Sequence, residues 1–333
     1  MATDLTSVTA PRTRRRRRRF SQLTGRDKRA LFFMTGIPTL VHVVFVWIPT
    51  IATVILSFTK WDGLAPVSKI HFVGFKNYWQ IFTVFKDDIY PALFNNATLL
   101  VFLFLGPTVL GIVLAYLLDK NIRGTAIYQG IYYFPVVLSL AVVGIIWKSV
   151  IYSPSQGLVN TVLGRTAEGH QTDWLGTQTK VFWLPGVEHS IGVGLSRNFA
   201  VILIAIAWRH AGYIMVLYLA GLKSVDPSLR EAAAIDGCNE WQAFRRVVFP
   251  AMKPINIVVV VITIIEALRT FDIVAALNSP VGMQLTSLLV TRNLLGEGGG
   301  NVGRGSAYGV VLLLLCIGFI IWYVVNNFRE ESR

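Results

Sequence analysis

The chain has few charged residues and almost no cysteine for its length. Charged residues make up 15% of its 333 residues, whereas 53% are hydrophobic, and the mean hydropathy is +0.56. So much apolar surface is unfavourable in water but is accepted by lipid, which excludes an ordinary soluble domain. The two cysteines, Cys238 and Cys316, form neither a disulfide framework nor a metal-ligand cluster.

The sequence also lacks the patterns of an enzyme that works alone. The glycine tract at 296–301 is not followed by Lys and Ser/Thr, so it is not a phosphate-binding loop. The histidines are scattered and show no nucleophile–base arrangement: His42, His71, His170, His189 and His210. We therefore expect no catalytic residues, no bound metal and no cofactor.

Long apolar runs dominate what is present. A helix needs about 20 apolar residues to span a bilayer. Runs of about this length lie at 31–56, 93–118, 127–151, 199–222, 254–277 and 307–327. Ile257–Ile265 is rich in β-branched residues, but the length of the run with its flanks favours a helix over a buried strand. The predicted fold class is an all-α polytopic membrane protein with six transmembrane helices.

Positive charge predicts the orientation. Ten of the 31 Lys and Arg residues precede the first apolar run, and six of them form the stretch Arg14–Arg19. A run of this kind suits nucleic acid or anionic lipid, but next to a membrane span it is typical of a cytoplasmic flank. We expect no nucleic-acid partner, cytoplasmic termini and a bacterial inner-membrane location. The expected parts are a basic arm (1–30), a membrane domain (31–328), a tail (329–333) and external segments at 57–92, 152–198 and 278–306.

One connecting segment, 226–250, is polar, rich in alanine and expected on the cytoplasmic side. Asp226-Pro227 is a helix-start signal, and Gly237 is a natural helix stop. Asn239 with Gln242 resembles a second capping signal. The sequence therefore predicts two short helices with an elbow at Gly237, small enough at Ala232 and Ala233 for close approach of a partner. Its alternative is an ordinary amphipathic loop.

The same segment reads Glu231-Ala232-Ala233, three residues, Gly237, nine residues, and then Val247-Val248-Phe249-Pro250. It resembles the signature Glu-Ala-Ala, three residues, Gly, nine residues, Ile-x-Leu-Pro. That signature belongs to the permease subunits of binding-protein-dependent ATP-binding-cassette importers. The resemblance implies ATPase-coupling roles for Glu231, Ala232, Ala233, Asp236, Gly237 and Pro250.

The resemblance covers most of residues 31–328 and narrows to the carbohydrate branch, the maltose/glycerol-3-phosphate type. It implies no enzymatic activity of the chain itself. The expected partners are a second homologous permease in a heterodimer, two ATPase subunits, an external solute-binding protein, membrane lipid and a polar solute, with a sugar as the expected class. The chain departs from the family at 177–198, which looks enlarged, and at 278–282, where a Thr-Gly-Gly-Gly-Pro turn is frequent.

Charged residues inside the expected spans are costly in lipid, so they should face a cavity, pair together or lie near a span end. Glu266, Arg269 and Asp272 are spaced to form an alternating ladder on one helix face. Two interpretations stay open: interhelical pairing that stabilises the fold, and the lining of a solute path. The candidate path residues are Arg209, Tyr213, Glu266, Arg269, Asp272 and Asn278.

Three functions compete. The first is the importer permease, for a sugar or for another solute. The second is an ATP-independent secondary transporter or channel, which leaves segment 231–250 without a role and is more typical of chains with internal repeats. The third is a membrane enzyme, which the absence of catalytic patterns disfavours.

Overall fold

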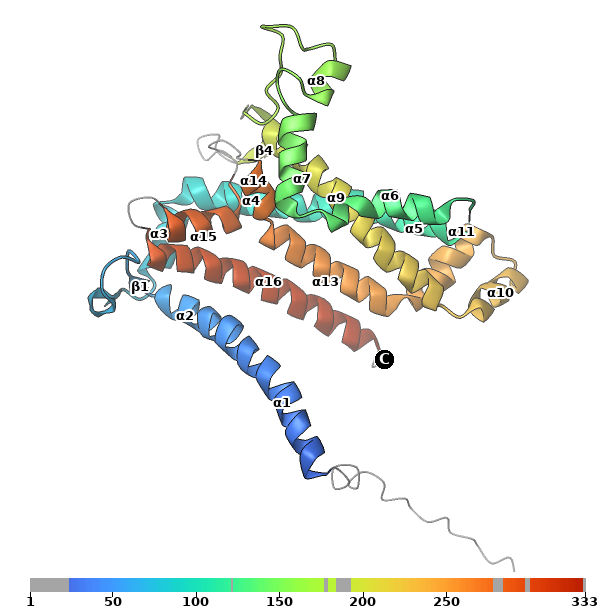
Figure 1. Ribbon diagram of the computed structural model, residues 1–333, viewed down its shortest axis with the longest axis horizontal. Helices are drawn as coiled ribbons and strands as arrows, with labels where there is room; N and C mark the ends of the chain where they lie inside the picture. Colours follow the sequence, from blue (N-terminus) through green and yellow to red (C-terminus); the bar gives the residue numbers. More distant parts are fainter. Residues whose placement is uncertain are drawn as a thin grey trace, which may run out of the picture. The chain divides into compact units, whose positions relative to one another are not determined.

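The computed structural model describes residues 24–120, 122–176, 179–183, 193–277, 284–296 and 300–331. It divides into two compact units, 1–53 and 54–333. The helices, drawn in Figure 1, are α1 (Gly25–His42), α2 (Ile48–Leu56), α3 (Lys76–Thr83), α4 (Lys86–Leu103), α5 (Val109–Asp119), α6 (Thr125–Val137), α7 (Leu140–Ile146), α8 (Leu158–Val162), α9 (Arg197–Ser224), α10 (Pro227–Ile235), α11 (Glu240–Ala243), α12 (Phe249–Ala251), α13 (Lys253–Arg269), α14 (Asp272–Ala276), α15 (Thr286–Leu295) and α16 (Val302–Glu331).

Short elements connect these helices. The π-helical turns are η2 (Val43–Trp47), η4 (Phe104–Thr108), η5 (Trp147–Ile151) and η7 (Phe244–Val248), and η3 (Val67–Lys69) is a 3-10 turn. β1 (Thr59–Lys60) pairs antiparallel with β2 (His71–Phe72), and β3 (Lys180–Trp183) pairs antiparallel with β4 (Gly194–Ser196). The helical prediction is therefore confirmed for the described chain, with strands confined to two small hairpins.

Four helical segments are long and apolar enough to cross a membrane: Gly25–Leu56, Lys86–Asp119, Arg197–Ser224 and Val302–Tyr323. The pair Thr125–Val137 and Leu140–Ile151 counts as a fifth if it is one span, but it bends by 101°. Leu138 is extended at this bend, and the hydroxyl of Ser139 accepts from the Val142 N–H to start α7. The expected continuous helix at 127–151 is therefore broken, because Ser139 caps a new helix there.

The expected span at 254–277 is also broken. α13 ends at Arg269, Thr270 and Phe271 leave the helix, and α14 starts at Asp272. The 17 residues of α13 are fewer than the roughly 20 that a perpendicular span needs. Within the described residues the structure thus supports several membrane helices, and the count of six stays a prediction.

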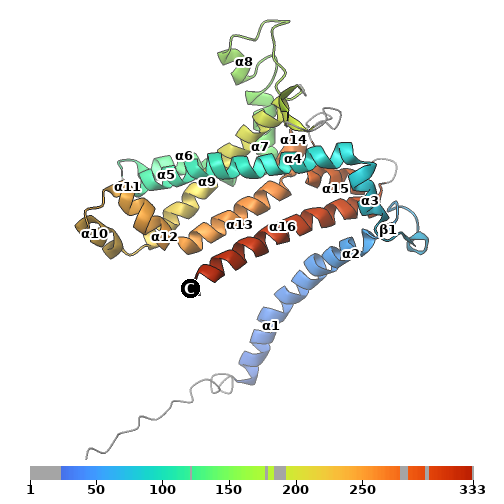
Figure 2. The same ribbon diagram turned by 180° about the vertical axis from the view of Figure 1, so that it is seen from behind.

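The central helix of the second unit is α9. It packs against α5, α6, α4 and α13, and Figure 2 shows α13 and α16 running side by side beneath it. Glycine allows two of these contacts: a Cβ on Gly111 would lie 2.8 Å from the carbonyl oxygen of Ala211, and one on Gly212 would overlap the carbonyl of Tyr132. Small residues let membrane helices approach closely.

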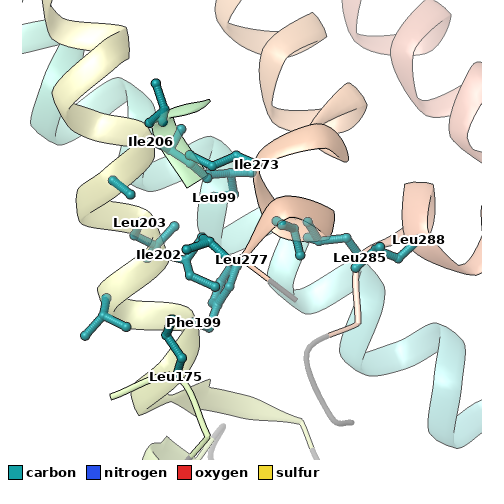
Figure 3. Packing of buried hydrophobic residues seen from close by; sticks show 14 of the residues in the cluster. Leu99, Leu175, Phe199, Ile202, Leu203, Ile206, Ile273, Leu277, Leu285 and Leu288 are labelled. Atoms are coloured by element: carbon teal, nitrogen blue, oxygen red, sulfur yellow. The ribbon is translucent and has the colours of Figure 1, made fainter. Parts of the chain in front are cut away.

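The largest apolar cluster joins α9 to the broken helix. Phe199, Ile202 and Ile206 of α9 pack with Leu99 of α4 and with Ile273 of α14 (Figure 3). Each of these side chains is at least 96% buried. This packing holds the break of residues 270–271 against the long helices on either side.

Candidate functional site

A cavity of about 160 Å³ lies beside the break between α13 and α14. Four predicted path residues line it: Arg209 of α9, Glu266 and Arg269 of α13, and Asp272 of α14. Apolar side chains complete the wall, namely Leu140, Ile206, Ile262, Ile265 and Ile273. The structure therefore brings Arg209, from the expected span 199–222, together with three charged groups of the expected span 254–277.

Arg209 and Glu266 form an ion pair across this cavity. Nη1 of Arg209 lies 2.9 Å from Oε1 of Glu266, and their side chains are 23% and 27% exposed. The Nε of Arg209 is buried and makes no hydrogen bond within the described chain. The pair thus neutralises two charges that would be costly in lipid.

The predicted ladder of Glu266, Arg269 and Asp272 on one helix face is wrong. The helix ends at Arg269, so Asp272 starts a separate helix and does not continue the face. Tyr213 packs against the apolar cluster of α5 and α9 and is not among the residues that line the cavity. Asn278 lies outside the described residues, as do the turn at 278–282 and half of the departure at 177–198.

The broken backbone beside the cavity is satisfied by side chains that sequence reasoning missed. Nδ2 of Asn96, on α4, donates to the Ala267 carbonyl at 3.1 Å, and its Oδ1 accepts from the Thr286 N–H at 3.0 Å. The hydroxyl of Ser287 donates to the Thr270 carbonyl at 2.6 Å. Irregular backbone at membrane depth needs such partners. The available signal was Asn95-Asn96, two buried amides inside an expected span.

The local geometry predicted for residues 226–250 is confirmed. Oδ1 of Asp226 accepts from the Ser228 N–H at 2.9 Å at the start of α10. Gly237 has φ +79, the left-handed conformation expected of the elbow. Asn239 and Gln242 exchange both bonds of a capping box at 2.9 Å.

The outer and inner faces of α10 differ. Glu231, Ala232 and Asp236 are exposed, and so is the apolar Ile235, which is 87% exposed. Ala233 is only 3% exposed and packs inside the chain. The surface offered by α10 is therefore formed by Glu231, Ala232, Ile235 and Asp236, with Ala233 supporting it from behind.

The end of α5 contacts both short helices of this segment. Nη1 of Arg230 on α10 lies 2.8 Å from Oδ2 of Asp119, and Nζ of Lys120 pairs with Oε2 of Glu240 at the start of α11. The hydrogen bond from Lys120 lowers the pKa of Glu240 from its ordinary value, and the bond to Glu240 raises the pKa of Lys120. Both groups are thus charged at neutral pH.

Solved structures share this fold. A bacterial ABC transporter that imports the acidic polysaccharide alginate contains a chain with a TM-score of 0.70 at 20% identity, which covers 91% of this chain and 96% of that one. The likeness shows the permease fold of a type I ABC importer.

Curated relatives extend over most of the chain. The osmoprotective compounds uptake permease GgtC of Synechocystis sp. is 34% identical over 293 residues, 86% of this chain and 94% of its own length. The diacetylchitobiose uptake permease NgcF of Streptomyces coelicolor is 30% identical over 95% of this chain and 86% of its own length. The trehalose/maltose permease MalF of Thermococcus litoralis is 28% identical over 93% and 98%.

Residues 107–331 match the family described as binding-protein-dependent transport system inner membrane component. The chain belongs to this family, and within it to the branch whose curated members are mainly sugar ABC permeases. It is an inner-membrane permease subunit of an ABC importer and is not an enzyme, because ATP hydrolysis in this family resides in a separate subunit.

Proposed function

We propose that this chain translocates a sugar or a related polar solute by alternating access, and that residues 231–250 couple it to a separate ATPase. The observation that carries this proposal is the pair of capped helices with the Gly237 elbow, which presents Glu231, Ala232 and Ile235 outward. An exposed isoleucine between small and acidic residues suits a cleft in a partner protein, since apolar groups at an interface gain from burial.

The solute class is supported by the relatives and by the cavity. Relatives of the chain are named for uptake of trehalose/maltose and diacetylchitobiose. The cavity is lined by Arg209, Glu266, Arg269 and Asp272, whose side chains can hydrogen-bond hydroxyl groups. Arg209, Glu266, Arg269 and Asp272 are thus the proposed path residues, and Tyr213 and Asn278 remain candidates.

The proposed assembly pairs this chain with a second homologous permease, two ATPase subunits and an external solute-binding protein. In the proposed topology of six spans with both termini in the cytoplasm, segment 231–250 lies on the ATPase side.

Site-directed crosslinking tests the coupling role. In a background with Cys238 and Cys316 changed to Ser, we compare Ala232→Cys with the matched control Ala233→Cys, since the first position is exposed and the second is buried. Crosslinking of Ala232→Cys to the co-purified ATPase, with weak reaction of Ala233→Cys, is the expected result. Absence of any ATPase, with uptake that is insensitive to ATP depletion, would instead establish the secondary transporter.

Calorimetry on the external receptor tests the solute class. Trehalose, diacetylchitobiose and xylose are titrated into the receptor that co-purifies with the complex, with glycine betaine as a non-sugar compound. Binding of a sugar supports the proposal. Binding of glycine betaine alone would favour the second candidate, a non-sugar osmolyte, which the relative named for osmoprotective compounds supports.

A further inference from the structure

Two ion pairs attach the end of α5 to both halves of the coupling segment. Asp119–Arg230 reaches α10, and Lys120–Glu240 reaches α11. We call these four residues the α5 clamp. Tyr116, one turn earlier, adds its ring at 4.9 Å from that of Phe244 and its hydroxyl at 3.4 Å from Oε2 of Glu240.

One charge of the clamp, that of Asp119, is unfavourable for α5 by itself. Asp119 is the last residue of α5, where the helix dipole disfavours a carboxylate. Its side chain is only 13% exposed and is paired with the guanidinium of Arg230 at 2.8 Å. Arg230 also donates from Nη2 to the Leu222 carbonyl at 3.4 Å. One side chain thus connects the carboxyl ends of α5 and α9.

The clamp is not a tightly packed interface. A cavity of about 230 Å³ lies among its members and is lined also by Ala234, Cys238 and Ala243. Contacts around a cavity are made by side chains that can move relative to each other, whereas close packing would resist such movement. The two ion pairs, together with the apolar contacts of Phe244 and Val248, therefore hold the coupling segment to α5 around this cavity.

α5 leads from the clamp to the translocation cavity. It continues through η4 into α4, and together they form the single span Lys86–Asp119. Asn96 on this span holds the carbonyl of Ala267 and the N–H of Thr286 at the break beside the cavity. At about 1.5 Å per residue, Asn96 and Asp119 are about 35 Å apart along the span. The span Lys86–Asp119 therefore contacts the coupling segment at one end and the broken helix near the other. Both contacts are made through side chains and not through the adjoining backbone.

We propose that the α5 clamp makes the span Lys86–Asp119 a second transmission element, in addition to α9 and α13, which are joined to the coupling segment through the chain. Movement of α10 and α11 displaces Asp119 and Lys120, and the span carries this displacement to the Asn96 anchor. Asp119, Lys120, Arg230 and Glu240 are thus positioning residues for transport. This proposal rests on the coupling role proposed above.

The test reads ATP hydrolysis and cavity opening separately. Ile265→Cys lines the cavity and serves as the reporter in the background with Cys238 and Cys316 changed to Ser. In the complete complex we measure phosphate release and the rate of labelling by a fluorescent maleimide, with and without ATP and vanadate. The clamp variants are Asp119→Asn, Arg230→Gln and the charge swap Asp119→Arg with Arg230→Asp, and the exposed Arg123→Gln in the same loop is the control.

In the single variants we expect ATP hydrolysis to continue while the response of Ile265→Cys labelling to ATP and vanadate falls by about fivefold or more, within the range usual for coupling between sites. The charge swap should recover much of the response, and Arg123→Gln should behave as the parent. A normal labelling response to ATP and vanadate in the single variants would overturn the proposed role of the α5 clamp. A labelling response that falls in strict proportion to ATP hydrolysis would overturn it as well. A parent complex without ATPase, or without any labelling response, instead overturns the proposed function.

Discussion

The ion pair between Arg209 and Glu266 gives a prediction with a defined magnitude. Glu266→Ala removes the carboxylate that lies 2.9 Å from Arg209 Nη1 and leaves a cation whose side chain is 23% exposed. Breaking a fully buried pair costs about 3–5 kcal/mol, whereas an exposed pair contributes about 0–1 kcal/mol. A pair that is about a quarter exposed should lie between these limits, at about 2 kcal/mol.

A cost of about 2 kcal/mol that falls on only one access state corresponds to a change of about thirtyfold in the equilibrium between access states. We therefore expect Glu266→Ala to insert and assemble but to lower initial uptake in proteoliposomes by tenfold or more, as an order of magnitude. Glu266→Gln keeps the size of the side chain and isolates the effect of the charge. Surface expression and thermal unfolding of the complex control for misfolding.

The double variant Arg209→Ala with Glu266→Ala separates a path role from a structural role. If the pair only stabilises the fold, removing both charges should restore stability and uptake together. If it lines the path, stability should recover while uptake stays low, because the hydrogen-bonding groups of the cavity are gone. Unchanged uptake in Glu266→Ala, with normal assembly, would refute the reasoning and remove Glu266 from the pathway.

Three further predictions concern packing, the elbow and pH. Gly111→Ala should destabilise the permease by about 1–3 kcal/mol through overpacking, and its unfolding temperature should fall. Gly130→Ala, which has open space around it, should leave the unfolding temperature unchanged. Equal effects of the two variants would contradict the contact assigned to Gly111. Gly237→Val should destabilise the elbow by about 1–2 kcal/mol at φ +79 and reduce ATP-driven uptake. Gly237→Asn should retain more uptake, because Asn accepts this conformation. Higher uptake in Gly237→Val than in Gly237→Asn would contradict the role of the elbow. The Lys120–Glu240 ion pair should persist from about pH 4.5 to about pH 10.5, the ordinary pKa values of the two groups. Glu240 loses its negative charge only as the pH falls through its lowered pKa, and Lys120 loses its positive charge only as the pH rises through its raised pKa. The defect of Lys120→Met, measured by the labelling response, should therefore be constant from about pH 6 to about pH 9, and a steep change in this window would exclude the pair as its cause.

The coupling segment could be predicted from the sequence because its signals are local. A helix cap, a left-handed glycine and a capping box act within a few residues of each other, so Asp226, Gly237 and the Asn239–Gln242 pair specify two helices and an elbow regardless of the surroundings. The family signature lies in the same residues, which explains why the functional class could be inferred from the sequence alone.

The breaks in the expected spans could not be predicted in the same way. At the break, Asn96 and Ser287, which are distant in sequence, bond backbone carbonyls that the end of α13 leaves free. The assumption of one continuous helix produced the incorrect ladder, since it placed Asp272 on the face of Glu266. The apolar composition of a segment indicates that it prefers lipid to water. It does not indicate where the backbone hydrogen bonds of a helix are interrupted.

The sequence by itself determined that the chain enters a membrane, that its cytoplasmic segment forms two capped helices, and which family signature that segment carries. Only the tertiary structure decided which charges meet. Arg209 and Glu266 are 57 residues apart, and Arg230 and Asp119 are 111 apart, so their pairing depends on how α9, α13, α5 and α10 pack. Local signals depend on neighbouring residues along the chain, whereas an ion pair between helices depends on the complete arrangement of the fold.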